Sequence, residues 1–339
     1  MKRNLVVWLV AIAGLAALPF LGMPVYLLHI AVQILLWGAV YTAWALMGRF
    51  GMMSLGHGGF LGIGAYVPAL LWNYYGITPW IGIPLGVALA VLVAVAIGFP
   101  CFHLRVVGHY FALVTLALSE VTERGIVAAR DITGGSLGLT PNTVSGTSLF
   151  ALQFPDKRHF FVIALVVWLV GLWVWHMIDG SMTRLSMTAS VEQDAAAAVG
   201  INVPREKLKI LLVSAALTSL GGSMLGQYLM YVNPGTLSGV MVTLQMLFAA
   251  VVGGMYTALG PTMGSALTII LMESLRILFG TRFIGAANTI YGILLIVFTI
   301  FMPVGIWGFV VRCWERRAAA QRARATGATS AQGAGASAR

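Results

Sequence analysis

Charged residues are scarce in this chain of 339 residues. Asp, Glu, Lys and Arg together make up 9 % of it, hydrophobic residues make up 59 %, and the mean hydropathy is +0.92. Soluble domains carry about 25 % charged residues, so this composition excludes an ordinary soluble globule and indicates a polytopic membrane protein. Cysteine is rarer still. Because Cys101 and Cys313 are the only two, a disulfide framework and a cysteine-based zinc site are not supported.

Motifs typical of enzymes are also missing from the sequence. It has no Gly-x-x-x-x-Gly-Lys-Ser/Thr segment, so it does not bind ATP through a P-loop, and we expect no cofactor in this chain. We therefore do not expect an enzyme; the one enzymatic alternative is an integral-membrane transferase that uses His57, His103 or His109. The net charge of +10 is spread over short loops and forms no single stripe, so no nucleic-acid partner is expected.

Long apolar runs are what the chain has in abundance. A membrane-spanning helix needs about 20 apolar residues. The runs predict an all-α fold, a polytopic transmembrane helical bundle of about ten spans with broken Gly-rich segments. The predicted spans are residues 5–21, 25–47, 57–75, 80–100, 110–128, 160–178, 208–231, 241–259, 262–280 and 287–311.

The basic residues predict the orientation of these spans. Ten spans place both termini on one side of the membrane. With the N-terminus inside, 14 of the 20 basic residues fall in cytoplasmic stretches, as the excess of Lys and Arg in cytoplasmic loops requires. We therefore expect both termini, and the polar segment 184–209, in the cytoplasm.

The polar segment 184–209 has the pattern of a short helix exposed to water. Ser190 followed by Gln193 forms a capping box, in which each side chain satisfies a backbone N–H of the other. Gly200 is suited to the left-handed position that ends a helix, and Pro204 follows it. The alanine-rich side of this helix could enter a groove of another protein. A simple surface helix between two spans is the alternative.

A glycine-rich stretch lies at residues 48–64, where seven of seventeen residues are glycine. Glycines let helices in a membrane approach closely, and they also occur in broken segments that are shielded from lipid. Ser54, Gly56, His57 and Gly58 are therefore predicted to serve either the solute path or close helix packing. A lone histidine at the end of a span is more often hydrogen-bonded than a ligand, and no metal site is expected.

Acidic residues within spans are costly in hydrocarbon and are candidates for function. Glu120 lies four residues from Arg124, and Glu273 lies three residues from Arg276, so each pair can meet on one helix face. Glu120 and Glu273 therefore belong either to the solute path or to structural ion pairs. The sequence divides into a permease domain at 1–311 and a basic tail at 312–339, which we expect to be disordered and to contact anionic lipid.

Several of these motifs together resemble the LivM-type permeases of the branched-chain amino acid ABC importer family. The similar segments, in order along the chain, are Ser54-Leu-Gly-His-Gly-Gly-Phe-Leu-Gly-Ile-Gly-Ala-Tyr66, Tyr110-Phe-Ala-Leu-Val-Thr-Leu-Ala117, Thr133-Gly-Gly-Ser-Leu-Gly-Leu139 and Glu192-Gln-Asp-Ala-Ala-Ala-Ala-Val-Gly-Ile-Asn202. The resemblance extends over about residues 34–311. It implies that the polar loop contacts an ATPase through Glu192, Asp194, Ala196, Ala198 and Gly200.

The resemblance also implies partners and a mechanism. The chain is expected to pair with a second, related permease, to bind two ABC ATPase subunits that use ATP, and to receive solute from an external binding protein. The setting would be a bacterial inner membrane, and the transport mechanism would be alternating access. The solute is a branched-chain amino acid, urea, an amide or another small molecule. An ion-driven secondary transporter or a channel is the alternative function, although neither requires a capped coupling helix.

Overall fold

The computed structural model describes residues 14–106, 108–144, 146–181, 183–184, 196 and 200–279, and near the end residues 289–290, 292–294, 297 and 305. Among these residues all regular structure is helical and there is no strand, which confirms the predicted fold class. Most of the predicted spans 5–21 and 287–311, and the whole tail 312–339, lie outside the described residues.

Helices of very different length make up the described part of the chain. The long helices are α2 (Val25–Gly48), α3 (His57–Tyr75), α4 (Pro79–His103), α5 (His109–Ala128), α7 (Lys157–Asp179), α10 (Val203–Leu229), α12 (Gly239–Gly253) and α13 (Gly260–Phe279). The short ones are the 3-10 helices η1 (Leu18–Leu21) and η2 (Gly135–Leu137) and the single turns α6 (Arg130–Thr133) and α11 (Pro234–Leu237).

Two predicted spans differ from the helices observed. Span 208–231 begins earlier, at Val203, because Asn202 caps the helix and Pro204 fits the first turn, where its missing N–H costs nothing. Pro204 thus starts a helix, whereas we expected it only to stop one. Span 241–259 ends early, at Gly253, because Gly254 adopts φ +112° and breaks the helix.

Six described helices are long and apolar enough to cross a membrane. They are Val25–Gly48, Pro79–His103, Lys157–Asp179, Val203–Leu229, Pro234–Gly253 and Gly260–Phe279, where the fifth joins α11 and α12. The predicted total of about ten spans is therefore not confirmed. Helices α3 and α5 have 19 and 20 residues and thus the length of a span, but they are less apolar.

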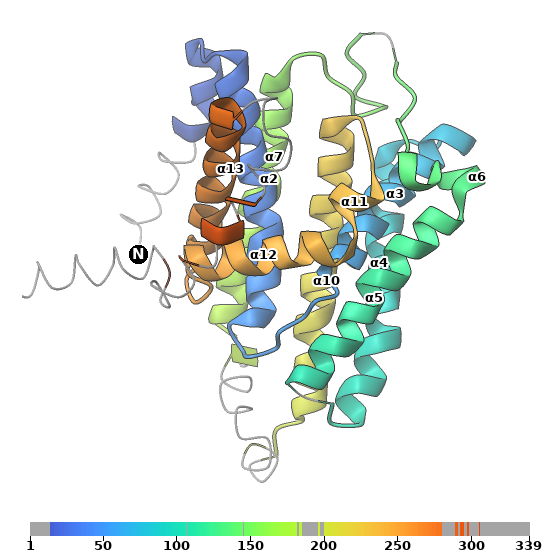
Figure 1. Ribbon diagram of the computed structural model, residues 1–339, viewed down its shortest axis with the longest axis vertical. Helices are drawn as coiled ribbons and strands as arrows, with labels where there is room; N and C mark the ends of the chain where they lie inside the picture. Colours follow the sequence, from blue (N-terminus) through green and yellow to red (C-terminus); the bar gives the residue numbers. More distant parts are fainter. Residues whose placement is uncertain are drawn as a thin grey trace, which may run out of the picture.

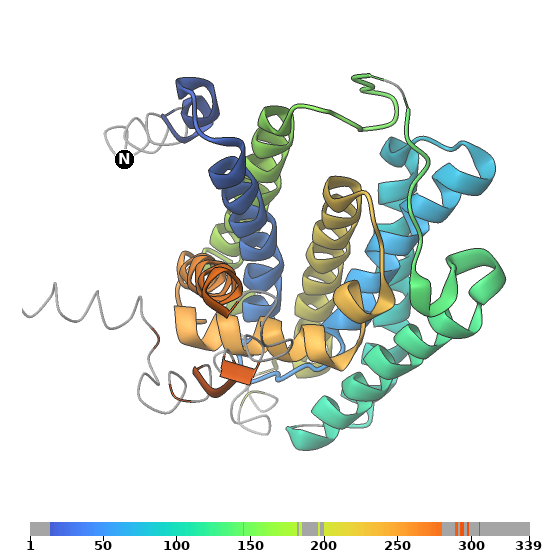
Figure 2. The same cartoon turned by 45° about the horizontal axis from the view of Figure 1, so that its top comes forward.

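Most long helices run along the length of the molecule, but α12 lies across them (Figures 1 and 2). It has 15 residues and so spans about 22 Å, which is short of the ~30 Å hydrocarbon core. The break between α11 and α12 lies at Ser238, which is extended, and Gly239, with φ +85°. We did not predict this break; it separates α11 from the transverse helix α12.

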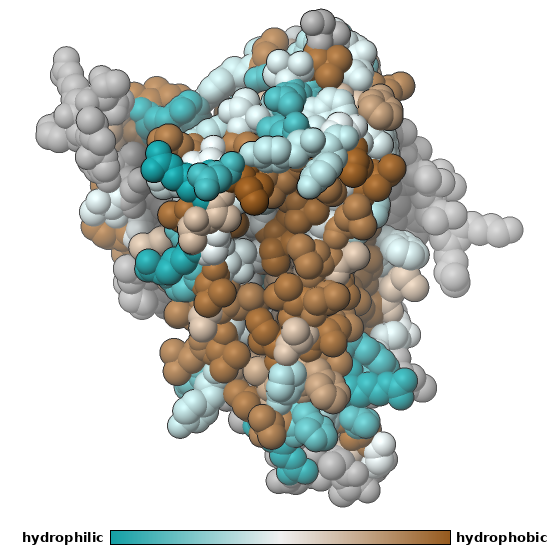
Figure 3. Space-filling model, turned by 90° about the vertical axis from the view of Figure 1, so that its right-hand side faces the viewer, coloured by the Kyte–Doolittle hydropathy of each residue, from teal (hydrophilic) through white to brown (hydrophobic). Residues whose placement is uncertain are grey.

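The outer surface carries a wide apolar band. On the face that Figure 3 shows, hydrophobic side chains occupy the middle of the molecule and hydrophilic ones gather toward its two ends. Leu92 and Phe99 are among the exposed large apolar residues of the described structure. A surface of this kind suits lipid, and the chain is a multi-pass membrane protein.

Helices α3 and α10 approach each other at glycines. A Cβ at Gly64 would lie 2.0 Å from the carbonyl oxygen of Ser219, and one at Gly222 would lie 2.2 Å from that of Leu61. No side chain fits at either position without moving backbone. The contact brings α10 against the glycine-rich half of α3, with Leu225 and Leu61 fully buried beside it.

We predict that Gly64→Ala destabilises the folded protein in detergent by about 1–3 kcal/mol, because the new methyl group would overlap the backbone of α10. The thermal unfolding midpoint of the purified chain measures this effect. Gly125→Ala in α5 is the matched control, since nothing lies within 4 Å of the added Cβ. Equal midpoints for the two variants would contradict the close contact.

Candidate functional site

A junction of broken backbone lies at the centre of the described structure. After α2 ends at Gly48, the chain rises through a non-helical connection to the level of α12, where α3 begins (Figure 1). A connection inside the membrane must find hydrogen-bond partners within the protein. We call residues 54–59, together with the side chains that bind their backbone, the junction.

Side chains of α5, α12 and α2 satisfy the backbone of the junction. The N–H of Leu55 donates to Thr115 Oγ1 at 3.0 Å, and Ser119 Oγ donates to the carbonyl of Leu55 at 2.7 Å. The N–H of Gly58 donates to Thr243 Oγ1 at 2.7 Å, and Trp44 Nε1 donates to the carbonyl of Ser54 at 2.9 Å. These contacts fix the start of α3 against three other helices.

His57 is fully buried in the junction, and both of its ring nitrogens are engaged. Nε2 lies 2.7 Å from Ser214 Oγ, and Nδ1 lies 3.1 Å from Ser54 Oγ. Since Ser214 Oγ donates its proton to the carbonyl of Ala43 at 2.6 Å, it must accept from His57 Nε2–H. Nδ1 then accepts the proton of Ser54. A neutral, fully bonded imidazole of this kind favours a structural role over a solute contact.

The glycines of the junction lie where backbone from other helices comes close. A Cβ at Gly58 would lie 2.1 Å from the carbonyl oxygen of Gly239, and one at Gly56 would lie 3.0 Å from that of Thr115. A Cβ at Gly239 would in turn lie 1.9 Å from Glu123 Oε2. The geometry therefore supports the close-packing alternative for Gly56 and Gly58.

Sequence reasoning missed four residues of the junction. Thr115, Ser119, Ser214 and Thr243 are each at most 2 % exposed, and each bonds to residues 54–59. Serine or threonine inside an apolar span was the available signal for such contacts. The signal is not specific, because these side chains also bond to the backbone of their own helix, as Thr218 does to the carbonyl of Ser214. The hydrogen-bond partners of these four residues lie far away in the sequence and could not be assigned without the fold.

Among the described residues, the acidic residues predicted within spans, Glu120 and Glu273, pair with residues outside the junction. Glu120 pairs with Arg124 at 3.0 Å on the outside of α5, where the Arg124 side chain is 81 % exposed. Exposed charges at membrane depth are unfavourable against lipid. This surface of α5 is therefore suited to contact a protein partner or water.

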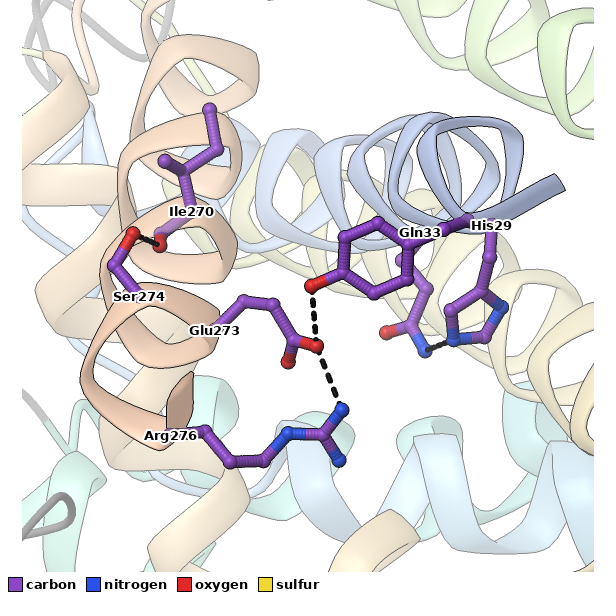
Figure 4. Close-up of polar contacts among 7 residues, drawn as sticks. His29, Gln33, Ile270, Glu273, Ser274 and Arg276 are labelled. Atoms are coloured by element: carbon purple, nitrogen blue, oxygen red, sulfur yellow. Dashed lines mark hydrogen bonds and ion pairs between the residues drawn. The ribbon is translucent and has the colours of Figure 1, made fainter. Parts of the chain in front are cut away.

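Glu273 forms a second polar group, between α13 and α2. Figure 4 shows its carboxylate pointing toward Arg276. Arg276 Nη2 donates to the carboxylate at 2.6 Å, and the Tyr26 hydroxyl donates to it at 2.7 Å. His29 and Gln33 lie beside them on α2. A cavity of about 150 Å³ opens here, and its polar lining comes from His29, Gln33, Gln245, Thr268 and Glu273. Of the predicted path residues, Glu273 thus borders a cavity.

The polar loop 184–209 is described only in part. Glu192, Asp194 and Ala198 lie outside the described residues, while Gly200 has φ +85° as expected. The N–H of Ile201 donates to the carbonyl of Ala196 at 3.1 Å, the long-range bond of a Schellman helix ending. Ala196 is 1 % exposed, so its side chain faces this chain and not a partner.

An ion pair joins the ends of α2 and α7 beside the start of this loop. Arg49 Nη1 donates to Asp179 Oδ1 at 2.6 Å, and the guanidinium lies 3.9 Å from the ring centroid of Trp175. Burial lowers the pKa of Arg49, and Asp179 opposes that shift. The pair fixes the relative positions of the two helices at the end where the loop leaves α7.

With this geometry in view, comparison with known proteins identifies the family. The sequence of residues 26–302 matches the protein family described as the permease component of branched-chain amino acid transport systems. The chain belongs to this family. No solved structure matches the permease.

Curated relatives are similar over most of the permease. It is 27 % identical over 255 residues to the high-affinity branched-chain amino acid transport system permease protein LivM of Escherichia coli, and equally to that of Salmonella typhimurium. These matches cover 68 % of the permease and 59 % of each relative. A probable branched-chain amino acid transport permease protein LivH of Methanocaldococcus jannaschii is 24 % identical over 265 residues, 75 % of the permease and 82 % of that relative.

We predict that His57→Leu lowers the stability of the permease by about 1–3 kcal/mol, because the buried Ser54 hydroxyl loses the acceptor of its proton and the Ser214 hydroxyl loses its donor. Thermal unfolding in detergent measures the loss, and a double-mutant cycle with Ser214→Ala should give a coupling energy above about 0.5 kcal/mol. His176→Leu on the exposed face of α7 is the control. A His57→Leu protein of unchanged stability that no longer transports would indicate a solute contact instead.

Proposed function

We propose that this permease is one membrane subunit of an ATP-driven importer in a bacterial inner membrane, for branched-chain amino acids or similar small polar solutes. The observation that carries the proposal is the polar loop between α7 and α10, which closes on a left-handed Gly200 with the Schellman bond from Ile201 to Ala196. A capped helix end suits a segment that transmits force from a motor subunit. The family match supports the same function.

The partners follow from that function. A second, related permease pairs with this one, two ABC ATPase subunits bind the cytoplasmic face and hydrolyse ATP, and an external binding protein delivers the solute. The exposed Glu120–Arg124 pair on α5 supports a protein or aqueous contact on that side. The cycle is alternating access, in which closure of the ATPases moves the two permeases between inward-facing and outward-facing states.

The cytoplasmic end is the one that carries the loop 184–209. Arg49, Arg105, Arg184 and Arg205 lie at this end of the helices, as the distribution of basic residues in the sequence requires for the inside. The predicted ten spans would place both termini on this side as well. The cavity beside Glu273 then lies toward the outer end of α2 and α13.

A cysteine introduced at Gln193 tests this orientation. We expect an impermeant maleimide to leave Gln193→Cys unlabelled in intact cells and to label it after the cells are opened. Ser148→Cys, in the connection before α7, should be labelled from outside. Labelling of position 193 in intact cells would reverse the topology.

Gly200→Val tests the coupling role. Valine at φ +85° is strained by about 1–2 kcal/mol, which should displace the end of the loop helix while leaving the spans in place. In reconstituted vesicles with the ATPase subunits and the binding protein, solute uptake and solute-stimulated ATP hydrolysis should fall together. Gly180→Val is the control, because Gly180 has φ −84° and its Cβ would make only ordinary contacts, 3.7 Å from the carbonyl oxygen of His176 and 3.9 Å from that of Met177.

The same variant separates the importer from its alternative. An ion-driven carrier or a channel passes no energy through this loop, so its transport would be unchanged by Gly200→Val. Normal ATP-dependent uptake in the variant would refute the coupling role. Thermal-shift measurements on the cognate binding protein with a panel of amino acids, urea and amides would identify the solute.

A further inference from the structure

A groove lies between the end of α4 and the start of α10. Its volume is about 220 Å³, and its lining consists of Phe99, Phe102, His103, Asn202, Pro204, Arg205 and Leu208. The interior is formed by phenylalanine, proline and leucine side chains, and the His103 ring stacks on Phe99 with centroids 5.7 Å apart and planes 11° apart. The polar side chains of the lining are those of His103, Asn202 and Arg205.

An exposed apolar stripe leads along α4 to this groove. Leu85, Leu89, Leu92, Val95 and Phe99 are each at least 40 % exposed. Their spacing of three or four residues puts them on one helix face. From Leu85 to Phe99 the stripe is about 21 Å long, more than the ~15 Å that one leaflet contributes to the hydrocarbon core. An acyl chain of that leaflet can lie along the stripe.

The polar side chains of the groove favour a negatively charged ligand. Arg205 is exposed and forms no ion pair with any described residue, and its neighbour Glu206 is turned to Lys209 at 2.6 Å and does not line the groove. None of the described lining residues carries a carboxylate that could bind the ammonium group of a zwitterionic lipid. An anionic headgroup therefore interacts favourably with Arg205, whereas the ammonium group of a zwitterionic headgroup offsets part of that interaction.

The helix dipole of α10 is not the source of this preference. Asn202 Oδ1 already accepts the N–H of Arg205 at 3.2 Å, the N–H of Glu206 donates to the carbonyl of Asn202, and Pro204 has no N–H. Anion recognition thus depends on the Arg205 guanidinium, with the Asn202 amide and the His103 ring as further polar groups in the lining.

From these observations we propose that the α4–α10 groove binds an anionic phospholipid. The phosphate lies between Arg205 and His103, and one acyl chain follows the apolar stripe of α4. The site adjoins the end of the loop 184–209, three residues after Gly200, so a bound lipid would hold α10 against α4 where the loop joins it. This inference does not depend on the identity of the transported solute.

Lipid retention by the purified full-length permease tests the proposal. In native mass spectrometry from mixed micelles, phosphatidylglycerol should be retained in preference to phosphatidylcholine. Arg205→Gln should lower phosphatidylglycerol retention about fivefold, which corresponds to about 1 kcal/mol for one basic residue, and should lower phosphatidylcholine retention less. Raising the salt concentration should weaken only the phosphatidylglycerol complex. Arg158→Gln, at the opposite end of the molecule, is the matched control.

A second variant tests the acyl-chain contact. Phe99→Gln keeps Arg205 but makes the entrance to the groove polar, so retention of phosphatidylglycerol should fall while that of a short-chain, water-soluble analogue should not. Equal retention of both lipids by the unmodified permease would overturn the proposal, as would equal losses for Arg205→Gln and Arg158→Gln. Displacement of the lipid by added ATPase subunits, with their binding dependent on Arg205, would assign the groove to a protein contact and overturn it too.

Discussion

A non-helical backbone at membrane depth must be hydrogen-bonded by the protein itself, since lipid offers no partner. The connection between α2 and α3 meets this requirement through hydroxyl groups from α5 and α12 and the indole of Trp44. Each bond needs helix backbones to come closer than side chains usually allow. Glycines at 56, 58, 64 and 222 make that approach possible, and the remaining helices pack around it.

The junction also connects parts of the chain that are distant in sequence. Ser214, on α10, holds His57 at the start of α3, and α10 begins three residues after Gly200, where the polar loop ends. A displacement of the loop therefore acts directly on a helix that is bonded to the junction. At the N-terminal end of the loop, the Arg49–Asp179 ion pair connects α2 to α7. The loop is thus held between two joined pairs of helices, which suits the coupling role proposed for it.

Much of the helical architecture was predictable because apolar runs and turn residues are local signals. The bounds of α3 agree with the predicted span 57–75, and those of α2, α5, α7 and α13 agree within a few residues. The left-handed Gly200 was predictable for the same reason. The prediction for 241–259 was wrong at its end, because composition alone did not indicate that Gly254 would take φ +112° and stop the helix. The total number of spans stays a prediction.

The sequence by itself determined that this chain lies in a membrane, where most of its helices begin and end, and which glycines and polar residues are unusual. Only the tertiary structure decided what those residues do. His57 could have been a ligand, but its two partners, Ser54 and Ser214, are 3 and 157 residues away, and the second is unknowable from spacing. Ala196 was expected on an exposed face and is buried. The physical reason is that hydropathy and helix capping act over one or two turns, whereas the close approach of α3 to α10 and α12 depends on how whole helices pack.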